Sequence, residues 1–105
     1  MLSFGMNPLS EKEVLEKLSA LSGWGLNAQK HLAKEFVFKD FVQNMKFINQ
    51  VAQLAEREGH HPDFTVHYNK VIFDIFTHSI QGLSQNDLNL AGQIEQLGRS
   101  AAAGN

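Results

Sequence analysis

The sequence predicts an α+β fold, in which three helices pack on one face of a four-stranded antiparallel sheet in the order α-β-β-α-β-β-α. Three observations indicate this class. Two capping-box sequences and an aspartate each precede apolar residues at helical spacing. Alternating segments separate these helices and carry a hairpin signal. A composition of 43% hydrophobic and 10% aromatic residues over 105 positions fits a folded globular chain. We expect residues 1–105 to form a single domain, with about eight flexible residues at the N-terminus and about five at the C-terminus.

The first helix is expected to begin at Ser10-Glu11-Lys12-Glu13, a capping-box sequence. The apolar residues that follow recur at helical spacing: Val14, Leu15, Leu18 and Leu21. Gly23 and Gly25 flank Trp24 and end this helix.

An extended segment is expected from about His31 to Phe38, within the pair of strands that precedes the second helix. Leu32, Phe36 and Phe38 fall on one face of it, and Val37 falls on the other. Lys34 interrupts the apolar side.

Asp40 is expected to open the second helix. Apolar residues spaced by four and three form one stripe along this helix, at positions 41, 45, 48, 52 and 55. A second stripe lies beside the first and consists of Phe47, Val51 and Leu54. The combined arc is wider than a single sheet-facing stripe requires. Two interpretations follow: a helix with one side on the sheet and the other on a partner helix, or one helix buried deep in the core.

Gly59 suits the position just past the end of that helix, and Pro62 prevents the helix from resuming. Residues 64–68 and 71–77 alternate around Asn69-Lys70, which predicts a hairpin. The residues of its second strand alternate between two faces: one face carries Val71, Phe73, Ile75 and Thr77, and the other carries Ile72, Asp74, Phe76 and His78. Ser84-Gln85-Asn86-Asp87 opens the last helix, and the tail from Ala101 to Asn105 is expected to fray.

Composition excludes several classes of function. The chain has no cysteine, so thiol nucleophiles and thiolate metal sites are ruled out. The formal net charge of −2, from nine basic and eleven acidic residues, argues against direct binding to nucleic acid. No signal peptide and no apolar run of about 20 residues is present, so we expect a cytoplasmic protein that does not bind membranes.

Histidine is the most informative residue of this chain. Gly59-His60-His61-Pro62 lies where the second helix ends, and His78 follows at the far end of the hairpin. If the hairpin folds back beside the helix end, the three imidazoles converge as an acid–base site that works near neutral pH. One alternative is a pair of surface imidazoles. Another is a zinc site, which is disfavoured because adjacent histidines rarely chelate one ion and no His-x-x-x-His spacing is present.

Four further residues are candidates for the site, and each has a structural alternative. Asp87 is the last residue of the Ser-x-x-Asp capping box, and Glu56 would by default be a solvated carboxylate. Trp24 and Phe64 would by default be core residues. His31 and His67 have no supporting context in the sequence, and we leave both out of the site.

In combination, these residues resemble the pterin-4a-carbinolamine dehydratase family, also known as the dimerisation cofactor of a homeodomain transcription factor. The resemblance covers about residues 10–97. Its motifs are Glu56-x-x-x-His60-His61-Pro62, Tyr68-Asn69-Lys70-Val71, Thr77-His78 and Gly82-Leu83-Ser84-x-x-Asp87-x-x-Leu90-Ala91, with Trp24 and Phe36-x-Phe38-Lys39-Asp40-Phe41. The ordered combination is far more specific than any single motif.

The resemblance implies a hydro-lyase that removes water from 4a-hydroxytetrahydropterin to give quinonoid dihydropterin, in the recycling of tetrahydrobiopterin. It implies no metal and no organic cofactor. His60, His61 and His78 would be catalytic, with His60 and His78 in proton transfer and His61 mainly in pterin binding. Glu56, Asp87, Trp24 and Phe64 would contact the pterin or orient the imidazoles.

The resemblance also implies a homotetramer, built through sheet edges and through central helices. The alternative function is a protein-interaction module, acting as a dimerisation cofactor or transcriptional coactivator with a transcription factor as its partner. Gly59 and Phe64 depart from the family pattern, which often has an acidic or amide residue and a tryptophan at these positions. Substrate affinity is therefore the property most open to change.

Overall fold

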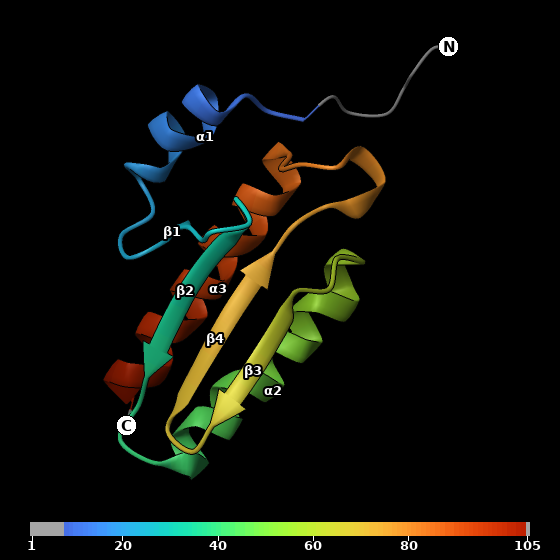
Figure 1. Cartoon of the computed structure of the whole chain (residues 1–105). Helices are drawn as coiled ribbons and strands as arrows, with labels where there is room; N and C mark the ends of the chain where they lie inside the picture. The colour runs from blue at the N-terminus through green and yellow to red at the C-terminus, as the bar shows by residue number, and fades with distance from the viewer. Residues whose placement is uncertain (1–7, 105) are drawn as a thin grey trace.

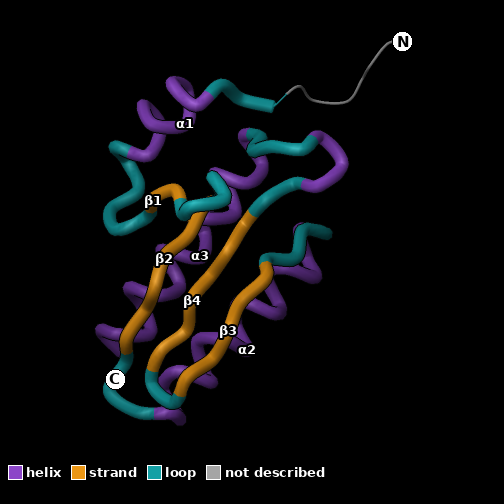
Figure 2. Tube along the Cα trace, in the orientation of Figure 1, coloured by secondary structure: helices purple, strands orange, loops and turns teal. Residues whose placement is uncertain are grey.

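The helices and strands follow the predicted order α-β-β-α-β-β-α. A computed structural model describes residues 8–104 of the chain. Figure 2 traces the elements, which are α1 (Glu11–Leu18), β1 (Gly25–Leu26), β2 (Leu32–Val37), α2 (Phe41–Glu58), β3 (Asp63–His67), β4 (Lys70–Ile75), a 3₁₀ turn η1 (His78–Ile80) and α3 (Gln85–Gly104).

The four strands form one antiparallel sheet in the order β1-β2-β4-β3. Figure 1 shows α2 and α3 behind this sheet, and α1 at the end where β2 begins. Among residues 8–104, no helix lies on the opposite face of the sheet. The two long helices therefore cover one face. The end of α2 and the start of α3 lie at the same end of the sheet.

The core lies between the inward face of the sheet and the two long helices. Val71, Phe73 and Ile75 of β4 are buried, whereas the outward Ile72 is 37% exposed, as their alternation predicted. The ring of Phe47 from α2 lies 5.0 Å from that of Phe36 and 5.8 Å from that of Phe73. These contacts bury the aromatic residues that stabilise the sheet against α2.

Helix α2 covers the core with one side only. Phe47, Ile48, Val51, Leu54 and Ala55 are buried. In contrast, Phe41 is 47% exposed and Val42 is 62% exposed. The interpretation of one deep core helix is therefore wrong, and an apolar stripe at the start of α2 faces solvent.

The hairpin turn is formed by Tyr68 and Asn69, one residue earlier than the sequence predicted. The buried Asn44 of α2 donates hydrogen bonds of 2.9 Å to the carbonyl oxygens of Tyr68 and Lys70. Asn69 is bound by Phe38, which donates its backbone N–H to the Asn69 carbonyl and accepts from the Asn69 side chain. These tertiary contacts fix the turn, and the local sequence could not supply them.

The structure describes the first helix and most of the C-terminal tail, so the predictions for both can be checked. Ser10 caps α1 as expected, because its hydroxyl accepts from the Glu13 N–H and its own N–H donates to the Glu13 carboxylate. Leu15, expected on the apolar face, is 53% exposed. Helix α3 extends to Gly104 through most of the segment expected to fray, and Gln43 donates to the Ala101 carbonyl. The flexible start was predicted for residues that lie mostly outside those described.

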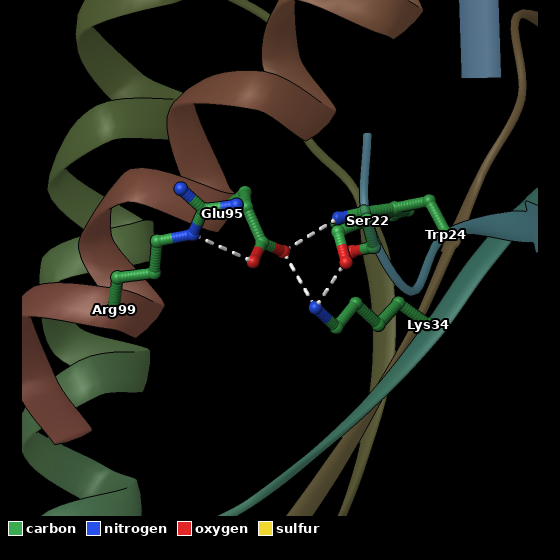
Figure 3. A network of polar contacts seen from close by, with 5 residues as sticks. All are labelled: Ser22, Trp24, Lys34, Glu95 and Arg99. Atoms are coloured by element: carbon green, nitrogen blue, oxygen red, sulfur yellow. Dashed lines mark hydrogen bonds and ion pairs between the residues drawn. The ribbon is translucent and has the colours of Figure 1, made fainter. Parts of the chain in front are cut away.

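A polar network is buried beneath the sheet, and it explains why Lys34 interrupts the apolar side of β2 (Figure 3). Lys34 Nζ lies 2.7 Å from Glu95 Oε1, and Trp24 Nε1 donates to the same oxygen at 3.0 Å. Arg99 donates to Glu95 Oε2 at 3.2 Å. Burial raises the pKa of the Glu95 carboxyl, but the hydrogen bonds from Lys34, Trp24 and Arg99 outweigh it and hold that pKa below its ordinary value.

Glu95→Gln is predicted to lower the free energy of unfolding by about 3 kcal/mol at neutral pH, because Lys34 remains as a largely buried cation without its carboxylate partner. A lowered carboxyl pKa in the folded state stabilises the fold above the unfolded pKa, and this contribution is lost as pH falls through the folded pKa. Urea unfolding near neutrality and near pH 4 should therefore show a smaller acid loss in the variant than in the wild type. The control is Glu35→Gln on the outward face of β2. Equal acid losses in the wild type and Glu95→Gln would contradict the prediction.

Candidate functional site

His60 is placed by the end of α2. Gly59 adopts a left-handed conformation, with φ of 65°, and the N–H groups of Gly59 and His60 both donate to the Ala55 carbonyl. A residue other than glycine is strained at this φ, so the sequence Gly-His specifies where the helix ends and where the imidazole begins. Pro62 follows and the chain turns directly into β3.

The imidazole of His60 is bound to a fully buried carboxylate. His60 Nε2 lies 2.7 Å from Asp87 Oδ1, and the Asp87 side chain is 0% exposed. Thr77 Oγ1 donates to Asp87 Oδ2 at 2.7 Å, and the Ser84 N–H donates to the same oxygen at 2.9 Å. Asp87 therefore completes the predicted cap of α3 and also binds two side chains from elsewhere in the fold.

This geometry determines which ring nitrogen of His60 is free. Asp87 Oδ2 already accepts two hydrogen bonds, and a carboxylate can only accept hydrogen bonds. Nε2 of His60 must therefore carry the hydrogen that lies between the two groups, and Nδ1 is left to give or take a proton. A carboxylate behind an imidazole also stabilises the imidazolium form during proton transfer.

A cleft of about 280 Å³ lies between the end of α2 and the start of α3, beside this pair. Most of the residues that line it carry polar side chains: Glu58, Gly59, His60, Thr77, Ser84, Asn86, Asn89, Leu90 and Gln93. A larger hollow of about 370 Å³ lies between Lys39, Lys46 and Ala101, but it contains no histidine. We take the smaller cleft as the candidate site because the acid–base chemistry is there.

His61 and Glu56 form a separate pair at the surface. His61 Nε2 lies 2.6 Å from Glu56 Oε2, and the two side chains are 61% and 79% exposed. An exposed pair of this kind contributes little stability. It is free to meet a ligand.

His78 is not on a strand, contrary to its expected position on the second strand of the hairpin. Strand β4 ends at Ile75, and His78 begins η1, where it is exposed. The reason is a backbone bridge between Thr77 and Gly82 that closes a tight loop. Among residues 8–104, no hydrogen bond or ring contact joins His78 to His60 or His61.

Trp24 and Phe64 differ in position. Trp24 is 6% exposed, packs edge-on against Phe36, and donates to Glu95, so it takes the core position that was its structural alternative. Phe64 lies on the edge strand β3 and is 39% exposed. Phe64 can therefore meet a ligand, and Trp24 is part of the core.

Several residues of the site were missed from the sequence. Thr77 was noted only as part of a motif, and its position before His78 gave no sign that it binds Asp87. Asn86, Asn89 and Gln93 recur at helical spacing, which could have placed them on one face of α3. His31, which we left out, pairs with Asp74.

Within residues 8–104, no group of three or more histidine, aspartate and glutamate side chains is placed to hold a metal ion. No helix in the same range is both long and apolar enough to cross a membrane.

Known proteins of one family are similar to this chain over most of its length. Residues 7–97 match the family model described as Pterin 4 alpha carbinolamine dehydratase. A protein of Nitrosospira multiformis, named "Putative pterin-4-alpha-carbinolamine dehydratase", is 46% identical over 92 residues, which cover 88% of this chain and 80% of that protein. A protein of Alkaliphilus metalliredigens with the same name is 40% identical over 95 residues, which cover 90% of this chain and 86% of that protein.

Solved structures agree with this result. The crystal structure of a transcriptional coactivator/pterin dehydratase from Brucella melitensis matches with a TM-score of 0.83 and 34% identity, over 88% of this chain and 99% of that one. A pterin dehydratase-like protein identified as a RuBisCO assembly factor in the alpha-carboxysome matches with a TM-score of 0.63 at 20% identity, over 72% of this chain and 89% of that one, and shares the fold alone. By sequence and by fold, the chain belongs to the pterin-4a-carbinolamine dehydratase family.

Proposed function

We propose that this protein is a 4a-hydroxytetrahydropterin dehydratase, a hydro-lyase that releases water and forms quinonoid dihydropterin. The observation that carries the proposal is the His60–Asp87 pair beside the cleft between α2 and α3, in a chain of this family. The pair supplies an imidazole with one nitrogen fixed and the other free, which is what a proton-transfer group requires.

The reaction needs two proton movements. The 4a-hydroxyl departs as water after it gains a proton, and the resulting cation then loses its N5 proton, so charge and atoms balance. We assign these transfers to His60 and His78, and we assign pterin binding and orientation to His61 with Glu56. Asp87 orients His60 through its 2.7 Å contact. These steps need no metal and no organic cofactor.

Substrate affinity depends on the two positions at which the chain departs from the family pattern. Gly59 brings no polar side chain to the cleft, so one contact to the ligand is absent there. Phe64 retains an aromatic face that is 39% exposed. We propose Phe64 as a stacking surface for the pterin and do not assign Trp24 to it.

His60→Ala and His78→Ala are each predicted to slow the dehydration of synthetic 4a-hydroxytetrahydropterin by about 100-fold, because each removes a positioned acid–base group. Stopped-flow absorbance with metal-free protein measures the rate. His67→Ala is the matched control, since His67 lies on the outward face of β3. A wild-type protein that does not accelerate the reaction would refute the proposed function. Full rates in both variants would refute only the assignment of the histidines.

Thr77→Val is predicted to lower the free energy of unfolding by about 1–3 kcal/mol, because the buried Asp87 carboxylate loses a donor. Thr77→Ser keeps the hydroxyl and should retain most of the stability. The matched control is Thr65→Val, at an exposed position of β3. Urea unfolding at neutral pH compares the three variants. Equal stabilities of Thr77→Val and Thr65→Val would show that the Thr77–Asp87 bond is not stabilising.

We also propose that the protein forms a homo-oligomer. Phe41 and Val42 leave an exposed apolar stripe on α2, and β3 is an edge strand whose five residues are all exposed. A second copy of the chain that covers Phe41 and Val42 would remove apolar area from water, and pairing with the backbone edge of β3 would satisfy that edge.

Light scattering at micromolar concentration is expected to give a mass above that of the 11.8 kDa chain. Phe41→Glu is predicted to shift the protein to a smaller species, because a charge would be buried in the contact. Lys12→Glu, on the exposed side of α1, is the control. A stable monomer in the wild type would contradict the oligomer.

A further inference from the structure

A second carboxylate–imidazole pair lies near His78, on the face of the sheet opposite α2 and α3. His31 Nδ1 lies 2.6 Å from Asp74 Oδ1, and the side chains are 16% and 32% exposed. Asn27 Nδ2 donates to the other carboxylate oxygen at 3.0 Å. With an ionised carboxylate, Nδ1 of His31 carries the hydrogen. The ring is thereby fixed in one orientation.

The backbone around His31 is also fixed. Asn27 Oδ1 accepts from the N–H groups of Gln29 and His31, at 2.9 and 3.0 Å. The Asn27 N–H donates to the His31 carbonyl at 2.9 Å, and Lys30 between them has a φ of 67°. This turn presents His31 at the start of β2, next to the residues that follow β4.

The rings of three residues meet at this point. Phe76 stacks on His31 with 4.0 Å between ring centroids and an interplanar angle of 23°. His78 is edge-on to both, at 5.1 Å and 73° from Phe76 and at 6.4 Å and 88° from His31. These two rings are the aromatic neighbours of His78 among residues 8–104.

His78 needs such neighbours if it is to transfer a proton. It begins a 3₁₀ helix of three residues and is exposed, so its own segment does not restrict the side chain. Proton transfer requires a defined approach of the ring to the substrate, and a displacement of about 1 Å can cost about 100-fold in rate. We propose that His31, held by Asp74 and stacked on Phe76, is a positioning residue for His78. The inference rests on the proposed function, in which His78 transfers a proton.

Steady-state dehydration kinetics test the positioning. His31→Ala is expected to lower kcat by about 10- to 100-fold with little change in KM, since the substrate still binds but the ring of His78 is no longer fixed. His31→Phe keeps a ring at this place and should restore most of kcat. The matched control His67→Ala should stay within about twofold of the wild type. In a His78→Ala background, His31→Ala should add no further loss.

Two kinetic results would overturn the inference. If His31→Ala behaves as His67→Ala does, His78 does not depend on His31. If His31→Phe is as slow as His31→Ala, the imidazole itself is required, and the role is not positioning.

A spectroscopic measurement keeps this test separate from the proposed function. In the wild type, proton NMR should show the His78 ring signals displaced by the ring currents of Phe76 and His31. His31→Ala should move these signals, and His67→Ala should leave them in place. Unmoved signals would overturn the inference even if the enzyme is active. Displaced signals in a protein without dehydratase activity would refute the proposed function and leave the contact of His31 with His78 established.

Discussion

Three parts of the fold meet at the carboxylate of Asp87. His60 comes from the end of α2, Thr77 from the chain just after β4, and the Ser84 N–H from the start of α3. A carboxylate that is 0% exposed is tolerated only when hydrogen bonds replace its water, and here the donors come from all three segments. The relative placement of both long helices and of the loop that carries His78 therefore depends on this group. The same group fixes which nitrogen of His60 is free.

Helix α3 is held to the sheet by a second carboxylate about 12 Å further along its axis. The Glu95 carboxylate accepts hydrogen bonds from Lys34 of β2 and from Trp24. Lys34 is therefore paired on the face of the sheet that α3 covers. Close to this network, a Cβ atom on Gly98 would lie 2.5 Å from a ring carbon of Phe36, which shows how closely helix and strand approach. Charge pairing sets the register of α3, and close packing sets its distance from β2.

Two histidines of the proposed site are supported in different ways. His60 is bound directly to a buried carboxylate, whereas His78 is exposed and has its neighbours on the open face of the sheet. His61 is bound to Glu56 at the surface. The site is thus distributed over the end of the sheet. The sequence suggested a compact cluster of three imidazoles, and within the described residues the structure joins only His60 to the buried Asp87.

The sequence by itself determined the fold class, the order of the elements, the cap of α1, the end of α2 at Gly59, and the family. The structural features depend on periodicity, on local hydrogen bonds and on the backbone freedom of glycine, all of which act over a few residues. The family was indicated by the resemblance of an ordered combination of motifs. Only the tertiary structure decided that Trp24 belongs to the core, that Lys34 is paired inside it, and that the turn lies at Tyr68-Asn69. It also decided that Thr77 serves Asp87 and that His31 lies beside His78. Each of these depends on contacts between different elements of the fold, and no pattern within one element encodes such contacts.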